Sequence, residues 1–366
     1  MNRRQSLATM AVLVTATLAA TGAATAATIP ATGSASGASS GRYEVGLFGD
    51  MPYGDYGRAH YPAVIEDLNA HHLAFSVFDG DMKNGSEPCY ADVDGSAQAA
   101  GKPDIYTYAL GYFRQLRAPS VILPGDNEWT DCDRAKITPH FDANDRLAYE
   151  RTLFYPTDRS LGRHPIRLTR QSAAYPENVR WANGPVTYIG LNIPGSDNNW
   201  IDPARDGTKE GPADEAQAEY TARNKANLNW LDQSFATATA AGSKAVMIVI
   251  QADMWDPSAA AKGTLAHYAD TKAALARHAI AFGKPIVLVN GDSHSFELDK
   301  PLTDAAPVNA AGDPSPNVIE NFTRVTTFGE FQNHWVSAIV DPADPNVFTF
   351  HPHLIPANVP TYTPPA

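Results

Sequence analysis

The sequence has little of what would hold a protein in a membrane or on a polyanion. After residue 26, no apolar run is long enough to span a bilayer, so no later membrane-spanning helix is expected. Lysine and arginine number 28 against 40 acidic residues, which disfavours nucleic acid as a partner. Only two cysteines are present, Cys89 and Cys132, so at most one internal disulfide can form.

The first 26 residues have the pattern of an export signal. Arg3 and Arg4 precede a stretch rich in Leu, Ala, Val and Thr, and small residues at positions 24–26 would suit cleavage. The apolar stretch is short and no stop-transfer pattern follows it, so a retained membrane anchor is the less favoured alternative. The arginine pair also fits the twin-arginine route. We therefore expect a secreted protein, periplasmic or extracellular, that does not bind membranes after cleavage.

Three further segments are expected after the signal. Residues 27–42 are small and polar, which predicts a disordered linker, residues 43–355 should form one domain, and residues 356–366 are a proline-rich tail. Losing Arg3 and Arg4 lowers the lysine and arginine count from 28 to 26 against 40 acids, a net charge of −14. Nothing in the pattern indicates an oligomeric state.

Within the domain, short apolar runs alternate with helical patterns, which predicts βαβ units and a largely parallel sheet. Strands are expected at residues 43–48, 73–78, 121–123, 186–191, 245–250, 286–289, 318–326, 335–340 and 347–350. Helices are expected at residues 63–71, 105–116, 214–241 and 265–282. Residues 134–184 show little periodicity, and residues 195–212 predict a long surface loop.

Oxygen-bearing side chains follow five of the predicted strands directly. They are Asp50, Asp81, Asp126, Gln251 and Asp292. Because the carboxyl ends of parallel strands meet at one edge of a sheet, these side chains should converge. Carboxylates brought this close repel one another unless a cation lies between them, so the pattern predicts a divalent metal site. Five separate solvated turns are the alternative.

The two cysteines each lie shortly after one of these strand ends. An exported protein meets an oxidising compartment, which favours pairing, and convergence of the strand ends would bring Cys89 and Cys132 together. We expect a disulfide between them, with two unrelated buried thiols as the alternative.

In order and strand context, these motifs resemble those of the calcineurin-like metallophosphoesterases over roughly residues 43–350. The family pattern is Asp-x-His, Gly-Asp-x-x-Asp, Gly-Asn-His-Asp/Glu, a lone His after a strand, and Gly-His-x-His. The resemblance implies an α/β fold, a sandwich of mixed β-sheets flanked by helices. It also implies hydrolysis of a phosphomonoester or phosphodiester, with a small phosphorylated substrate as partner, by attack of a metal-bound hydroxide.

Position by position, the resemblance implies a set of metal ligands. They are Asp50, Asp81, Asp126, Gln251, Asp292 and His294. Pro52 stands where the family has a histidine ligand, and Gln251 and Asp292 also replace histidines. Because imidazole nitrogens are exchanged for oxygens, Mn²⁺ or Mg²⁺ is expected rather than Zn²⁺ or Fe, with Ca²⁺ as a further option.

Asn127 and His294 are the candidate catalytic residues, by the positions that they match. Asn127 replaces the histidine that assists the leaving group, and an amide cannot protonate an alkoxide. His294 could supply that proton if it is not a metal ligand. Lys83, Asn127 and Arg134 are the candidate substrate-binding residues, because a fixed positive charge or an amide suits a phosphate.

Two other functions remain open. A degenerate member of the family could bind a cation and a phosphorylated ligand or surface partner without turnover, and a structural calcium site is a third possibility. The histidines other than His294, among them His71 and His353, are expected to serve packing.

Overall fold

The computed structural model describes residues 41–203, 209–304 and 316–359. The chain divides into two units, Met1–Gly37 and Ala38–Ala366, and every described residue belongs to the second. The predicted export signal, nearly all of the linker and the end of the tail lie outside the described residues. Within the described ranges, no helix is both long and apolar enough to cross a bilayer.

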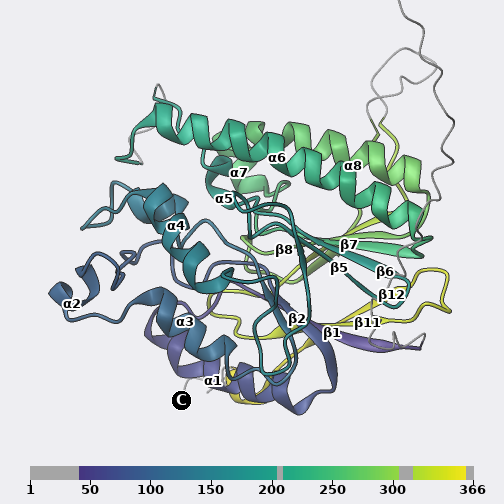
Figure 1. Ribbon diagram of the computed structural model, residues 1–366, viewed down its shortest axis with the longest axis horizontal. Helices are drawn as coiled ribbons and strands as arrows, with labels where there is room; N and C mark the ends of the chain where they lie inside the picture. The colour runs from purple at the N-terminus through teal and green to yellow at the C-terminus, as the bar shows by residue number, and fades with distance from the viewer. Residues whose placement is uncertain (1–40, 204–208, 305–315, 360–366) are drawn as a thin grey trace, which may run out of the picture. The chain divides into compact units, whose positions relative to one another are not determined.

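One sheet has five strands in the order β12-β11-β1-β2-β3. Its parallel part consists of β1 (Tyr43–Phe48), β2 (Leu73–Phe78) and β3 (Ser120–Ile122). β11 (Trp335–Val340) is antiparallel to β1, and β12 (Phe348–His353) is antiparallel to β11. Figure 1 shows α1 (Gly54–Ala70) and α3 (Ile105–Phe113) below this sheet.

The other sheet has seven strands in the order β4-β5-β6-β7-β8-β10-β9. Its parallel strands are β6 (Val186–Gly190), β7 (Ala245–Val249), β8 (Ile286–Asn290) and β10 (Phe322–Thr326). The antiparallel strands are β4 (Thr169–Arg170), β5 (Val179–Asn183) and β9 (Glu297–Asp299). In Figure 1, α6 (Ala213–Ala240) and α8 (Ala269–Phe282) lie above this sheet.

Shorter elements complete the described part of the chain. The α-helices are α2 (Ser96–Ala100), α4 (Ala143–Phe154), α5 (Gly195–Asn198) and α7 (Pro257–Lys262). The 3₁₀ turns are η1 (Thr130–Asp133), η2 (Ala266–Tyr268) and η3 (Pro356–Asn358).

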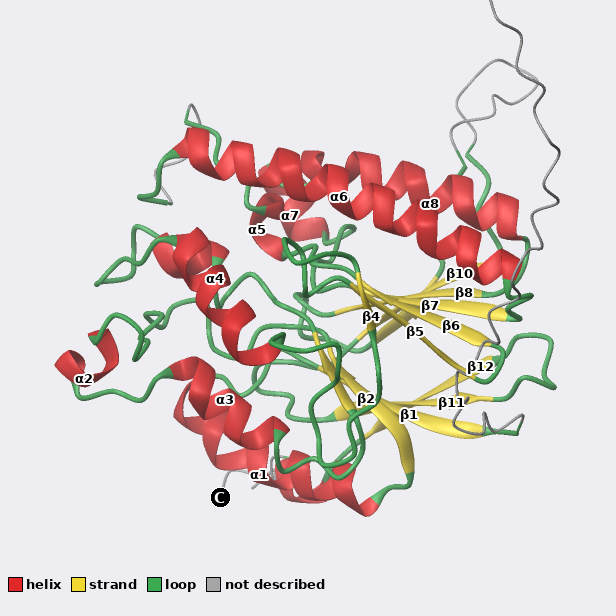
Figure 2. Ribbon diagram, viewed as in Figure 1, coloured by secondary structure: helices red, strands yellow, loops and turns green. Residues whose placement is uncertain are grey.

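Three buried apolar clusters hold the layers together. The first lies between the sheets and includes Val45, Val77 and Met247. The second packs Leu231 of α6 and its neighbours on the seven-stranded sheet, and the third packs Ile65 of α1 and its neighbours on the five-stranded sheet. Figure 2 shows the strands between the two helical layers. The predicted sandwich of mixed sheets flanked by helices is therefore confirmed.

The expectation of one largely parallel sheet was wrong, because the strands divide between two mixed sheets. A strand that is buried on both faces has the same apolar pattern in either sheet. β11 and β12 are antiparallel because only a short turn joins them, whereas parallel neighbours need a long crossover.

Other differences concern the helices and the predicted loop. α1 begins at Gly54, nine residues before the predicted helix, and includes Pro62. α4 went unpredicted because Arg146 and Glu150 lie on its buried face and hide the apolar period. Residues 195–199, predicted to lie in a surface loop, are partly helical and mostly buried.

Candidate metal centre

The five predicted strand ends converge at one rim of the sandwich, although they come from two sheets. β1, β2 and β3 of one sheet meet β7 and β8 of the other. The backbone N–H of Asp292 donates to both carboxylate oxygens of Asp50 at 3.1 Å. The side-chain amide of Gln251 donates to Oδ1 of Asp126 at 3.2 Å. The site therefore joins the two sheets.

Turns in the left-handed region direct the carboxylates into this rim. Asp50, Asp81 and Asp292 have φ values of 49°, 66° and 71°. Such a conformation costs roughly 1–2 kcal/mol for a residue with a side chain. The glycines beside these turns permit close approach, since a Cβ on Gly125 would collide with the carboxylate of Asp81. Packing of the two sheets thus imposes a local geometry that the turns alone would not favour.

Asp50, Asp81 and His294 form a group of possible metal ligands at the rim. Each offers one ligand atom, and these atoms lie within 4.8 Å of one another. Asp50 and Asp81 are almost completely buried, whereas the side chain of His294 is 29% exposed. Nε2 of His294 lies 3.3 Å from Oδ1 of Asp50, and its Nδ1 lies 3.4 Å from a carboxylate oxygen of Glu330.

Asp126 and Asp292 form a second group, on either side of Gly195. A Cβ on Gly195 would lie 2.9 Å from Oδ2 of Asp126 and 2.9 Å from both oxygens of Asp292. The N–H of Gly195 donates to Oε1 of Gln251 at 2.5 Å. All six predicted ligands therefore lie in one connected region, although their role as ligands stays a prediction.

Tyr53 is a site residue that the sequence reasoning missed. Its hydroxyl donates to Oδ2 of Asp81 at 2.8 Å and to Oδ1 of Asp50 at 3.3 Å. The side-chain amide of Asn127 donates to the same hydroxyl and to Oδ2 of Asp81, at 2.8 and 2.6 Å. Its position three residues after Asp50 is the signal in the sequence that could have identified it.

Ser196 was also missed, because it lies in the segment predicted to be a surface loop. Its hydroxyl contacts Oδ2 of Asp126 at 2.6 Å and Oδ1 of Asp131 at 2.7 Å. Arg134 donates to the Ser196 hydroxyl at 3.3 Å and forms an ion pair with Asp131. The Arg134 side chain is 39% exposed and lies 4.0 Å from Asp126, so this predicted substrate-binding residue borders the site and is reachable from solvent.

Lys83 is buried, whereas a side chain that binds substrate is expected to reach solvent. It is 1% exposed, and its Nζ donates to the backbone carbonyl of Asn84 at 3.0 Å. Burial lowers its pKa to about 8, although Asp131 and Glu128 act in the opposite direction. Its contact with a substrate stays a prediction, while the structure shows a lysine enclosed beside the acidic cluster.

The surroundings of three buried carboxylates disfavour their charged form. Burial, and then the charges of Asp126 and Asp50, raise the pKa values of Asp81 and Asp292 well above the usual value. Burial and Asp50 do the same for Asp79, whose Oδ1 is buried without a hydrogen-bond partner in the described part of the chain.

At two other groups of the rim, the surroundings favour the charged form over the neutral one. Burial works against ionisation of Asp126, but the charge of Arg134 and the hydrogen bond from Ser196 outweigh it and lower the pKa. Burial disfavours protonated His294, yet the hydrogen bond to Asp50 and the nearby carboxylates raise its pKa to about 9. Crowded buried carboxylates beside one imidazole fit a divalent cation, which would neutralise charge that the protein leaves unbalanced.

The predicted disulfide between Cys89 and Cys132 is present, with 5.5 Å between the Cα atoms. Cys132 lies in η1, directly after the segment that carries Asp126 and Asn127. The bond therefore links this segment to the chain that follows β2.

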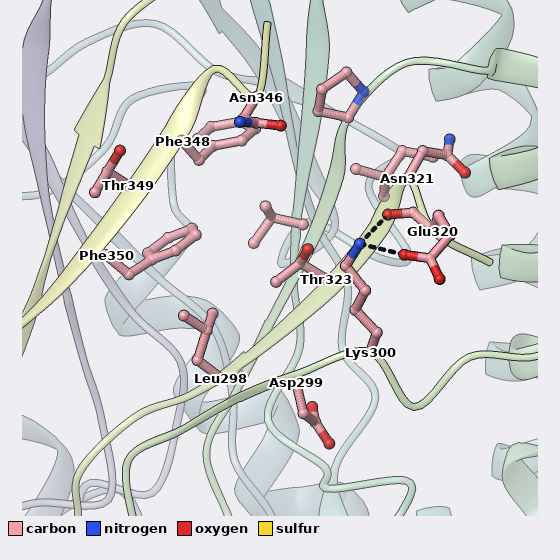
Figure 3. Close-up of a pocket in the computed structure, with 13 residues that line it drawn as sticks. Leu298, Asp299, Lys300, Glu320, Asn321, Thr323, Asn346, Phe348, Thr349 and Phe350 are labelled. Carbon is pink, nitrogen blue, oxygen red and sulfur yellow. Dashed lines mark hydrogen bonds and ion pairs between the residues drawn. The ribbon is translucent and has the colours of Figure 1, made fainter. Parts of the chain in front are cut away.

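A cavity of about 660 Å³ lies away from the acidic rim. Figure 3 shows Phe348 and Phe350 of β12 on one side and Thr323 of β10 on the other, with Lys300 bonded to Glu320. The cavity borders the first residues of β8, whereas Asp292 follows its last residue. No predicted ligand lines it, so its size does not bear on the metal site.

Comparisons with known proteins show distant likeness only. No family model and no curated protein matches the sequence. Among solved structures, GAP50, "the anchor in the inner membrane complex of Plasmodium", has a TM-score of 0.42 and 10% identity, over 86% of this chain and 89% of that one. The phosphopantetheinyl hydrolase PptH from Mycobacterium tuberculosis has a TM-score of 0.36 and 13% identity, over 78% and 89%. Scores this low carry no functional argument, so the function is argued from the site.

Proposed function

We propose that this protein is a metal-dependent phosphoesterase that hydrolyses a small phosphomonoester or phosphodiester. The observation that carries the proposal is the group formed by Asp50, Asp81 and His294, with ligand atoms within 4.8 Å of one another at the carboxyl ends of three strands. The resemblance of the motif order to calcineurin-like metallophosphoesterases supplies the reaction class.

The residues that would hold the cation are the six at the rim. They are Asp50, Asp81, Asp126, Gln251, Asp292 and His294. Five of the six offer oxygen, which favours Mn²⁺ or Mg²⁺ over Zn²⁺. A bound divalent cation supplies Lewis acidity toward a phosphoryl oxygen and lowers the pKa of water.

The protein's own side chains divide the remaining tasks. Arg134 is partly exposed at the rim, so its guanidinium can meet phosphoryl oxygens from solvent. Asn127 and Tyr53 hold the carboxylate of Asp81 in place through hydrogen bonds of 2.6 and 2.8 Å. In this arrangement Asn127 is a positioning residue, because its amide is already engaged with Asp81.

The test uses p-nitrophenyl phosphate and bis(p-nitrophenyl) phosphate as probes. We expect turnover with Mn²⁺, its loss in EDTA, and a fall of at least about 100-fold in kcat/KM for Asp81→Asn, about 2.7 kcal/mol. Asp55→Asn is the matched control, since its side chain is fully exposed, and it should keep wild-type activity. Absence of turnover on both probes with Mn²⁺, Mg²⁺, Ca²⁺ and Zn²⁺ would reject the proposal.

Cation-dependent binding without hydrolysis is the second candidate. The observation that favours it is the amide at position 127, bonded to Asp81 and Tyr53, where the related enzymes have a histidine that assists the leaving group. This function predicts binding of inorganic phosphate by calorimetry in the presence of Mn²⁺, lost in Asp81→Asn, with no turnover of either ester.

We also infer that the protein is exported, with the twin-arginine route as one option. The inference is supported by Arg3 and Arg4 before an apolar stretch and by the disulfide between Cys89 and Cys132, which forms in oxidising compartments. Detection of the mature protein outside the cytoplasm, beginning after residue 26, is the expected result.

A further inference from the structure

Two histidines and an aspartate meet at a place far from the acidic rim. Asp67 lies in the last turn of α1, His71 directly follows that helix, and His353 is the last residue of β12. One ligand atom from each lies within 4.8 Å of the other two. Asp67 and His71 are four residues apart, the spacing that places two side chains on one face of a helix.

The cluster is separate from the strand-end site. Glu44, which contacts His71, is near the start of β1, whereas Asp50 follows its end. Six residues of strand at about 3.3 Å each place Glu44 about 20 Å from Asp50. A single cation cannot serve both places.

Neighbouring groups hold these side chains as the outer partners of a metal site do. The indole N–H of Trp335 donates to Oδ2 of Asp67 at 2.7 Å. A carboxylate oxygen of Glu44 lies 3.4 Å from Nδ1 of His71, which can fix the tautomer of that imidazole. Trp335 also stacks on the ring of His353, with 4.4 Å between ring centres. The ligand atoms are thus oriented before any ion binds.

The cluster is reachable from solvent. The side chains of Asp67, His71 and His353 are 25%, 29% and 31% exposed. Nε2 of His353 lies 2.9 Å from Oδ2 of Asp67. The guanidinium of Arg117 donates to the backbone carbonyl of His71 at 2.8 Å.

We propose that Asp67, His71 and His353 form a second metal site, selective for Zn²⁺ over Mg²⁺ and Ca²⁺. Two imidazoles and one carboxylate are a ligand set that Zn²⁺ takes in proteins, and imidazole disfavours the harder cations. Glu44 lies beside His71 and adds a second negative charge near the ion. A bound ion would join the end of α1 to the last strand of the five-stranded sheet.

The test measures Zn²⁺ binding to the untagged full-length chain after treatment with EDTA. All variants are made in a chain that carries Asp81→Asn, which removes a proposed ligand of the strand-end site. Co²⁺ absorption reports nitrogen ligands. We expect one equivalent of Zn²⁺ in this background and at least about tenfold weaker binding in His353→Ala and in His71→Gln. Mg²⁺ at the same concentration should not compete.

His72→Ala and His351→Ala are the matched controls, because each is an exposed histidine beside a proposed ligand. Both should bind Zn²⁺ as the Asp81→Asn background does. Circular dichroism and the melting temperature in EDTA verify that every variant is folded. Equal affinity in the folded His353→Ala and His71→Gln variants, or no Zn²⁺ binding in the background, would overturn the second site and leave the phosphoesterase proposal untouched.

Discussion

The phenol of Tyr53 lies between two of the candidate metal ligands. Its hydroxyl hydrogen-bonds to Asp81 at 2.8 Å and approaches Asp50 at 3.3 Å. Burial, and then the charges of Asp81 and Asp50, raise its pKa, so the hydroxyl keeps its proton as a donor at neutral pH. In the family whose motifs the sequence resembles, a histidine ligand stands where this chain has Pro52, directly before Tyr53.

Replacing Tyr53 by phenylalanine should destabilise the cation-free protein by about 1–3 kcal/mol, because Asp81 loses a buried hydrogen bond. Urea unfolding in EDTA measures the change. Tyr56→Phe is the control, since Tyr56 is half-buried and stacks on His60. A Tyr53→Phe variant as stable as the wild type would show that this bond contributes nothing.

Glu150 is a buried carboxylate that lies outside the proposed ligand set. It is 0% exposed on α4. Burial, and then the charges of Glu128 and Glu177, raise its pKa well above the usual value, although Arg151 opposes them. Ionising Glu150 therefore costs more in the folded protein than in the unfolded chain.

This shift predicts a pH-dependent effect of Glu150→Gln. The stability contributed by protonated Glu150 is fully present below the unfolded pKa, about 4.3, and is lost as the pH rises through the folded pKa. The free energy of unfolding of the variant should therefore rise relative to that of the wild type between pH 5 and 8. The rise should be about 1.4 kcal/mol for each unit by which folding raises the pKa of Glu150. Urea unfolding at four pH values measures this gain.

Glu215→Gln is the matched control for the pH series, because Glu215 is exposed on α6. Its difference from the wild type should be constant over the same pH range. A free energy of unfolding of Glu150→Gln that falls relative to the wild type toward pH 8 would mean that Glu150 is stabilised as an anion in the folded protein.

At the scale of elements, the disulfide connects the segments after β2 and β3. Cys89 and Cys132 are 43 residues apart, and a crosslink over this length should stabilise the fold by about 4 kcal/mol through the unfolded chain. Replacing both cysteines by serine should lower the melting temperature accordingly. Calorimetry with and without a reductant measures it, and the reductant should have no effect on the double variant. An unchanged wild-type transition under full reduction would contradict the prediction.

At the scale of the whole molecule, the candidate site joins the two sheets of the sandwich. Asp50 and Asp81 follow strands of one sheet, while Asp292 follows a strand of the other. A cation held by both sheets binds only the folded protein. Unfolding must therefore release the ion, which couples stability to cation concentration.

Mn²⁺ at 100 times its dissociation constant should raise the free energy of unfolding by about 2.7 kcal/mol. Calorimetry with Mn²⁺ and with EDTA measures the difference. The shift should disappear in Asp81→Asn and persist in His353→Ala, which separates this site from the proposed zinc site. A melting temperature that does not respond to any divalent cation would count against the metal centre.

Much of the strand pattern follows from local sequence. β1, β2 and β11 match their predicted ranges residue for residue, because a continuous apolar run between polar turns has few other conformations in a globular protein. Asp50, Asp81 and Asp292 were proposed for the same reason, since each follows a glycine within two residues of the end of such a run. The prediction of the disulfide between Cys89 and Cys132 depended on the same placement of the strand ends.

Other features depended on long-range contacts. Tyr53, Ser196 and the pair His71 and His353 gain their positions from residues distant in the sequence, and no local pattern distinguishes them from packing residues. The buried polar face of α4 likewise depends on partners that only the folded chain provides.

By itself, the sequence determined the strands, the acidic turns that follow them and the cysteines available for pairing, because these depend on neighbouring residues. Only the tertiary structure decided that the strands form two sheets and that Asp50 meets Asp292 across a separation of 242 residues. The physical reason is that sheet membership depends on which distant strands pair, and this pairing is decided by the burial of whole faces.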